Sequence, residues 1–97
     1  MAKYYLTNKA VEDLAAIWNY TFDEWSENQA DKYYVFLLES CQEVAENPNL
    51  GKKYDNAAHK LLGYKSSQHI LFYQIISEEE IEIIRILHVR MDLKSKF

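Results

Sequence analysis

Ninety-seven residues are enough for one folded domain, and a chain with 48% apolar and 14% aromatic residues is too hydrophobic to stay disordered. The single cysteine, Cys41, excludes an internal disulfide and a cysteine-based zinc site. The net charge of −4 argues against broad nucleic-acid binding, and the charge is unevenly spread: residues 12–46 carry nine acids and one lysine, whereas residues 47–65 carry four lysines and one aspartate.

The beginning of the chain, MAKYYLTNKA, is polar and contains no apolar secretory core. No apolar run approaches the roughly 20 residues that cross a bilayer. We therefore expect a soluble protein of the cytoplasm that does not enter a membrane.

The first part of the chain has the pattern of a short strand followed by a helix. Residues 3–7 (KYYLT) are rich in aromatic side chains, as strands often are. From Asn8 to about Trp25 apolar residues recur every three or four positions, and Thr7 is a suitable N-cap. The expected inner stripe of this helix is Val11, Leu14, Trp18, Thr21, Phe22 and Trp25.

A second helix is predicted over about residues 28–47. Ser26 followed three residues later by Gln29 forms a capping-box signature, which starts the new helix after a very short connection. Pro48 and Gly51 then end it. The inner stripe should consist of Ala30, Tyr33, Leu37, Cys41, Val44 and Ala45. The two helices are expected to form an antiparallel hairpin.

The second half of the chain changes to the composition of β-strands. Residues 68–76 (QHILFYQII) and 81–89 (IEIIRILHV) are rich in isoleucine and aromatic residues, and a turn of four or five residues around SEEE should join them. Residues 60–65 (KLLGYK) suggest one more short strand. The basic stretch at residues 51–60 is expected to be a solvated loop, with contact to phosphates or an acidic partner as the alternative. This order predicts an α+β fold, with an N-terminal strand and two helices packed on one face of a small twisted antiparallel sheet.

Alternation along residues 81–89 makes both faces of the last strand apolar, as in an interior strand. It places Arg85 on the face of Ile81 and Ile83 and His88 on the opposite face, unless a bulge intervenes. A charge among isoleucines needs a partner or a route to solvent. Asp13 of the first helix is one possible partner for Arg85.

Three segments together resemble ParE-type toxins of the RelE/ParE superfamily over about residues 4–92. Residues 10–37 (AVEDLAAIWNYTFDEWSENQADKYYVFL) resemble the helical hairpin of that family, PNLG at 48–51 matches its P-x-x-G, and HILFYQI with IEIIRILHVRMD is similar to its C-terminal hairpin. The matching hairpin positions are Ala10, Asp13, Leu14, Ile17, Tyr20, Trp25, Gln29, Ala30, Tyr33 and Leu37.

The resemblance implies a toxin of a type II toxin–antitoxin pair. A cognate antitoxin of ParD type would fold over the toxin, and the pair would repress its own operon, so that operator DNA is met only through the antitoxin. Members of the ParE type poison DNA gyrase without a known catalytic residue, whereas relatives of the RelE type cleave mRNA on the ribosome. We expect no cofactor and no metal.

RNA cleavage would require a base, an acid and cations around the scissile phosphate. The candidates for these roles are Lys65, His69, Arg85, His88 and Arg90, with both histidines able to titrate near neutral pH. The end of the chain, MDLKSKF, opposes this interpretation, because it has Asp92 where the RelE type favours a tyrosine or histidine. An acid beside the phosphate would repel it.

Binding to a target protein needs anchors on a surface instead of a catalytic set. The candidate target-binding residues are His88, Arg90, Met91, Asp92 and Lys94, with a frayed end of the chain as the alternative for 94–97. The candidate antitoxin-binding residues are Tyr20, Phe22, Tyr34 and Phe36, each of which could instead belong to the core. His88 and Asp92 do not converge on a metal from a strand, and Cys41 suits a buried apolar position.

The leading hypothesis is thus a ParE-like, non-enzymatic inhibitor of DNA gyrase. The alternatives are a ribosome-dependent mRNA endoribonuclease of the RelE type and a member that only binds its antitoxin.

Overall fold

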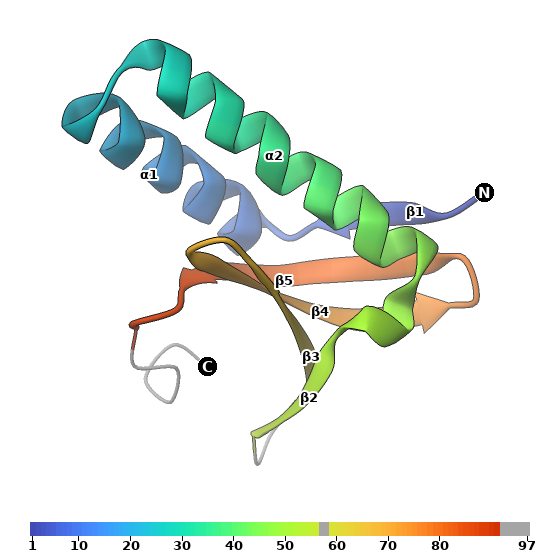
Figure 1. Cartoon of the computed structure of the whole chain (residues 1–97). Coiled ribbons are helices and arrows are strands. Elements are labelled where there is room, and N and C mark those ends of the chain that lie inside the picture. Colours follow the sequence, from blue (N-terminus) through green and yellow to red (C-terminus); the bar gives the residue numbers. More distant parts are fainter. Residues whose placement is uncertain (57–58, 92–97) are drawn as a thin grey trace.

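One strand, two helices and four further strands follow one another along the chain. The computed structural model describes residues 1–56 and 59–91, and the side chains of residues 1–54 and 61–91. The elements are β1 (Lys3–Leu6), α1 (Asn8–Glu24), α2 (Glu27–Glu46), the 3₁₀ turn η1 (Pro48–Leu50), β2 (Lys52–Asn56), β3 (His59–Ser66), β4 (His69–Ser77) and β5 (Glu80–His88). Both helices lie on one side of the sheet, while β2 and β3 curl away from them (Figure 1).

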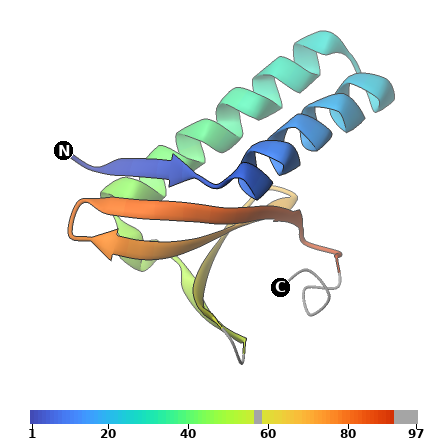
Figure 2. The same cartoon turned by 180° about the vertical axis from the view of Figure 1, so that it is seen from behind.

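The five strands form one sheet in the order β1-β5-β4-β3-β2. The pairs from β2 to β5 are antiparallel, whereas β1 lies parallel to β5 along its outer edge (Figure 2). The predicted α+β fold is confirmed, and the parallel β1 makes the sheet mixed. The interior place of β5 agrees with its two apolar faces.

Both helix starts follow from their capping residues. The Thr7 hydroxyl accepts a hydrogen bond from the Ala10 N–H at 3.1 Å, and the Ser26 hydroxyl accepts one from the Gln29 N–H at 3.1 Å. Each bond satisfies a backbone donor that the first helical turn leaves without a partner. In the described part of the chain, no helix is long and apolar enough to cross a membrane.

Two local predictions are wrong. Residues 52–56, expected in a basic loop, form β2 and pair with β3 from Lys52 opposite Gly63 to Asn56 opposite His59. The ladder with β3 outweighs the low strand propensity of lysine, aspartate and asparagine. The connection between β4 and β5 consists of two residues, Glu78 and Glu79, and not of four or five, because the flanking serine and glutamate join the strands.

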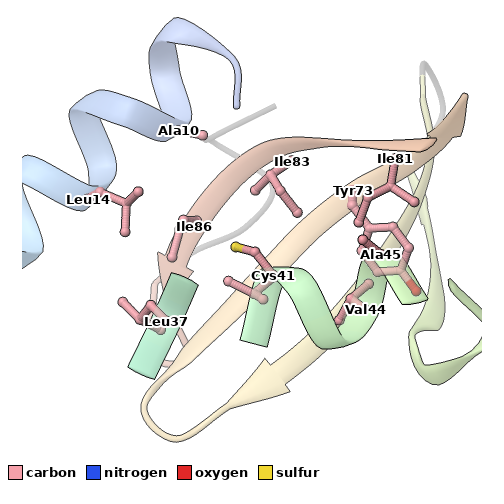
Figure 3. Packing of buried hydrophobic residues seen from close by; sticks show 11 residues of the cluster. Ala10, Leu14, Leu37, Cys41, Val44, Ala45, Tyr73, Ile81, Ile83 and Ile86 are labelled. Carbon is pink, nitrogen blue, oxygen red and sulfur yellow. The ribbon is translucent and has the colours of Figure 1, made fainter. Parts of the chain in front are cut away.

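The main core lies between the helices and the sheet (Figure 3). From α2 it receives the predicted stripe, with Leu37, Cys41 and Val44 fully buried. From α1 it receives only Ala10 and Leu14 as buried residues. The cluster consists of Ala10, Leu14, Leu37, Cys41, Val44, Ala45, Leu71, Tyr73, Ile81, Ile83 and Ile86.

The predicted stripe of α1 is wrong for Val11, Phe22 and Trp25, which are all exposed. Val11 follows the buried Ala10 and lies off the helix face that Ala10 and Leu14 bury, whereas for Phe22 and Trp25 the physical reason is the length of the helical hairpin. The connection between α1 and α2 extends past the end of β5 in both views (Figures 1 and 2). The second half of α1 therefore has little sheet beneath it.

A bulge in β5 changes which side chains face the helices. Phe72 pairs with Arg85 but Tyr73 pairs with Ile83, so Ile84 is the additional residue. The phase of alternation shifts by one. Ile86 therefore joins Ile83 on the helical face, which regular alternation would not allow. Arg85 shares the far face with Phe72, so its predicted grouping with Ile83 is wrong.

The P-x-x-G sequence is explained by Tyr73. Its hydroxyl donates to the Pro48 carbonyl and accepts a hydrogen bond from the Gly51 N–H at 3.0 Å. A Cβ atom at position 51 would collide with the hydroxyl and ring of Tyr73, which is fully buried. Glycine is thus required for close packing of the chain after α2 against β4.

Replacing Gly51 with alanine should lower the free energy of unfolding by about 1–3 kcal/mol, because the buried ring of Tyr73 has to move. Urea denaturation measures the change. The matched control is Asn49→Ala, an exposed position in the same turn, which should alter stability by less than about 0.5 kcal/mol. Equal stability of Gly51→Ala and the wild type would contradict this explanation.

Candidate functional site

A groove of about 690 Å³ opens where the helical hairpin extends past the sheet. We call it the hairpin groove. Its walls come from the second half of α1, the first turns of α2, the β3–β4 turn and the end of β5. The lining residues are Asp13, Ala16, Ile17, Tyr20, Thr21, Trp25, Gln29, Tyr33, Ser67, Gln68, His69, Ile86, His88 and Met91. Its size is that of a typical ligand or peptide pocket.

Tyr33 and two histidines form the polar part of the groove. The Tyr33 hydroxyl lies 2.7 Å from Nδ1 of His69 and accepts a hydrogen bond from the Gln68 N–H at 3.3 Å. Either atom can be the donor of the bond between Tyr33 and Nδ1, since the direction depends on the tautomer of the His69 ring. The ring of His88 meets that of His69 edge-on, with centroids 5.3 Å apart.

The pKa of His69 is lowered to about 4, chiefly by burial and in smaller part by the nearby His88. The prediction that His69 titrates near neutral pH is therefore wrong. The ring is neutral at pH 7, so the groove gains no cation from it. Nδ1 of His88 accepts the Arg90 N–H at 3.1 Å, which holds the backbone after β5 against the His88 ring.

Asp13 fixes α1 to the edge of β5, and its predicted pairing with Arg85 is confirmed. Nε of Arg85 lies 2.8 Å from Oδ2 of Asp13, and Nη2 lies 2.9 Å from Oδ1. Oδ2 also accepts the Ile86 N–H at 3.0 Å. The carboxylate raises the pKa of Arg85. Although Asp13 lines the groove, both of its oxygens already have partners.

The sheet separates the five residues considered for RNA cleavage. His69 and His88 lie on the helical face, in the hairpin groove. Arg85 pairs with Phe72 and Lys65 pairs with Ile70, and both of these partners belong to the apolar cluster of the opposite face. Arg90 is exposed beyond the end of β5. The structure therefore brings the two histidines together and places Lys65, Arg85 and Arg90 away from them.

All four residues predicted to meet an antitoxin are exposed: Tyr20 to 65%, Phe22 to 45%, Tyr34 to 37% and Phe36 to 44%. Only Tyr20 lines the hairpin groove. Phe22 stacks on Trp18, and Phe36 stacks on Tyr33. Each of these four positions thus exposes aromatic area on the helical hairpin, which is the property that the prediction required.

Trp25 is a residue whose position the sequence pattern misjudged. It was assigned to the core, but it is 76% exposed and lines the groove. The available signal was its position directly before the Ser26 cap: Trp25 is the C-cap residue of α1 and does not continue the helical periodicity.

The candidate target-binding residues lie at the end of β5, as far as the structure describes them. His88 and Met91 line the groove, and Arg90 is exposed between them. Asp92 and Lys94 lie outside the described residues. In the described part of the chain no three His, Cys, Asp or Glu side chains gather as metal ligands. Burial raises the pKa of Cys41 to about 12, so its thiol is protonated and inert at neutral pH.

Comparison with known proteins decides the family. The family described as ParE toxin of the type II toxin–antitoxin system, parDE, matches residues 4–93. The chain belongs to the ParE toxin family. Toxin ParE1 of Mycobacterium tuberculosis is 33% identical over 92 residues, which cover 95% of this chain and 94% of that protein. Toxin ParE1 of Caulobacter vibrioides is 32% identical over 95 residues, covering 98% and 97%.

A solved structure supports the fold independently. The chromosomal ParDE toxin–antitoxin system from P. aeruginosa contains a chain that matches with a TM-score of 0.78 at 21% identity, covering 93% of this chain and 98% of that one. The resemblance to ParE-type toxins inferred from the sequence is thus confirmed in family and in fold.

Removing the Asp13 carboxylate should strongly destabilise this ParE toxin family member. Asp13→Ala leaves the Arg85 guanidinium without this carboxylate and the Ile86 N–H without its acceptor, so we expect a loss of about 2–3 kcal/mol in urea denaturation. Asp23→Ala, an exposed position on the same helix, is the control and should change little. A small effect of Asp13→Ala would show that the Asp13–Arg85 bridge makes no net contribution to the free energy of unfolding.

His69 should make stability depend on pH. Its pKa in the folded chain, about 4, lies below the ordinary value of 6.5, so the unfolded chain binds more protons between these values. Stability should therefore fall as the pH drops from 6.5 towards about 4. The measurement is the free energy of unfolding across this range for the wild type and for His69→Gln.

The variant removes the titrating ring but keeps a side chain that can both donate and accept a hydrogen bond, so its stability should decline less steeply over that range. The carboxylates titrate in both proteins, and the difference between the two curves isolates the ring. Parallel curves would contradict the assignment.

Proposed function

We propose that this chain is the toxin of a type II toxin–antitoxin pair that inhibits DNA gyrase by binding it and is neutralised by a ParD-like antitoxin. Membership of the ParE toxin family over nearly the whole chain supports the first part. The similarity to a ParDE system, in which toxin and antitoxin occur together, supports an antitoxin of the ParD type as the partner.

One observation favours inhibition by binding over catalysis: the sheet separates the candidate catalytic residues. A ribonuclease needs acid, base and cation around one phosphate. Here Arg85 is bridged to Asp13, Lys65 lies on the far face, and the two histidines sit among apolar side chains. A pKa of about 4 also leaves His69 far from the value that suits acid–base work at neutral pH.

The end of β5 is the proposed surface for gyrase. Arg90 and Met91 are exposed there, and the chain continues into the predicted positions Asp92 and Lys94. Arginine and methionine are enriched at protein interfaces, where a few anchors supply most of the binding energy. The exposed aromatic residues of the helical hairpin are the proposed surface for the antitoxin, because a partner that covers them removes apolar area from water.

A ribosome-dependent endoribonuclease of the RelE type is the second candidate, and the pairing of His69 with His88 is the observation in its favour. Two imidazoles side by side can divide the roles of acid and base. Transcripts isolated after induction distinguish the two activities, because cleavage within codons, lost on His88→Ala, would establish the nuclease.

Purified gyrase provides the test of the leading proposal. The wild-type protein should inhibit supercoiling, and Arg90→Ala and Met91→Ala should each weaken inhibition about tenfold, the loss expected for a contact of 1–2 kcal/mol. Glu78→Ala, at the opposite end of β5, is the matched control and should inhibit like the wild type. Undisturbed supercoiling at a large excess of toxin would refute gyrase as the target.

A further inference from the structure

We propose that two copies of this chain form a dimer by pairing residues 74–77, the last part of β4, across a two-fold axis. The two strands would run antiparallel and join the two sheets into one. This inference goes beyond the proposed function, because the dimer requires neither the antitoxin nor gyrase.

The last part of β4 has a neighbouring strand on one side only. In the described part of the chain, the ladder between β3 and β4 ends where Leu62 pairs with Tyr73, although β4 continues to Ser77. On its other side β4 stays paired with β5 as far as Ser77 opposite Glu80. Residues 74–77 therefore present a strand edge, which we call the open edge of β4, to a partner.

An apolar cluster on the far face of the sheet explains why β3 leaves β4. β2 and β3 curl away from the helices (Figure 1), and the ring of Tyr54 on β2 meets that of Phe72 edge-on, with centroids 5.2 Å apart. Gly63 permits this contact, because a Cβ atom there would collide with the Tyr54 ring. The curl helps to bury Phe72, but it takes β3 away from the end of β4.

The open edge is apolar and has little of the protection that edge strands usually carry. Ile75 is 49% exposed and Ile76 54%, and residues 74–77 include neither a charged residue nor a proline. Lysine, proline or a covering segment normally keeps such an edge from pairing with another chain. A bulge between Ile75 and Ser77 adds twist to the edge but no charge. The edge is thus suited to pair with another strand.

The order of side chains along the open edge fits a second copy of itself. Residues 74–77 are polar, apolar, apolar and polar when read in either direction. Antiparallel pairing of Ile75 with Ile76 of the second copy places isoleucine against isoleucine and Gln74 against Ser77, and a two-fold axis repeats both pairs. The paired length of four residues equals the stretch of β4 that lacks a β3 partner.

The charges at the two ends of the open edge complement each other across the same axis. Glu78, in the turn after β4, is exposed at one end. Lys53 is exposed at the other end, because it pairs with Leu62, where the ladder between β3 and β4 stops. Antiparallel pairing brings the Glu78 end of each copy to the Lys53 end of the other, so that both contacts between the copies are attractive.

Other occupants fit the open edge less well. A strand from another protein, including the antitoxin, has to supply the matching order of side chains and charges independently, whereas a second copy supplies both by symmetry. Nucleic acid would bring phosphates to an edge that has no cation in residues 74–77 and an acid directly after them. The measurements below separate these occupants from the proposed one.

Self-association of the purified chain without antitoxin tests the proposal. Sedimentation at increasing concentration should show a monomer that converts to a dimer. Ile75→Lys and Ile76→Lys should each raise the dissociation constant at least about tenfold, because each puts a charge against an apolar side chain near the axis. Val35→Lys replaces a β-branched residue on α2 that is 52% exposed, so it is the matched control and should dimerise like the wild type.

Charge reversal tests the antiparallel orientation. Glu78→Lys and Lys53→Glu should each raise the dissociation constant about fivefold, because the two-fold axis makes each repulsion occur twice. The double variant restores opposite charges and should dimerise like the wild type. A double variant that dimerises no better than the single variants overturns the proposed pairing.

Amide hydrogen exchange locates the interface without any substitution. Exchange in residues 74–77 of the wild type should slow as its concentration rises, whereas exchange in β1, at an outer edge of the sheet, should not change. Each variant is first checked for a wild-type thermal transition, which is expected because all of the substituted side chains are exposed. The exchange measurement decides the question for any variant that fails this check.

The remaining outcomes overturn the dimer and leave the proposed function to its own test. A wild type that stays monomeric at every concentration overturns it, and so does a dimer that both isoleucine variants leave unchanged, because another surface then forms it. Slow exchange in residues 74–77 that appears only with antitoxin, or only with RNA, identifies that molecule as the occupant instead. Loss of the dimer does not contradict gyrase as the target, and undisturbed supercoiling does not contradict the dimer.

Discussion

The carboxylate of Asp13 joins the helices to the sheet just beyond the point where the pairing of β1 with β5 ends. β1 pairs with β5 only as far as Leu6 opposite Ile83. Beyond that point side chains continue the ladder: the Thr7 hydroxyl donates to the Ile84 carbonyl at 2.8 Å, and Asp13 accepts the Ile86 N–H. The exposed edge of an interior strand is thereby satisfied by the start of α1.

The bulge at Ile84 and the Asp13–Arg85 bridge belong to one arrangement. The additional residue turns Arg85 out of the main core and lets Ile86 enter it. The guanidinium then reaches the carboxylate with two short hydrogen bonds. Because a half-buried charge without a counter-charge is costly, this pairing allows an arginine in the middle of an isoleucine-rich strand. The bridge also sets where α1 crosses the sheet, and therefore where the hairpin groove opens.

Much of the fold could be predicted from the sequence because its signals are local. Thr7 and Ser26 cap the helices they were expected to cap, and Pro48 with Gly51 ends α2. The stripe of α2 was predicted well because its later turns, from Leu37 to Ala45, pack on the sheet. The stripe of α1 was predicted poorly, since periodicity reports which residues share a face but not how much sheet lies below it. Trp25 was misplaced for this reason, and its exposure makes it central to the groove.

The sequence by itself determined both helices, every strand except β2, the α+β class and the resemblance to ParE-type toxins, because caps, breakers and apolar periods act over a few residues. It also suggested Asp13 as the partner of Arg85, from the physical need to neutralise a charge inside a strand. Only the tertiary structure decided the faces of β5, since a bulge of one residue reverses alternation without changing composition. It also decided that His69 lies next to His88 while Lys65 lies on the far face, because strand register brings distant residues together or separates them.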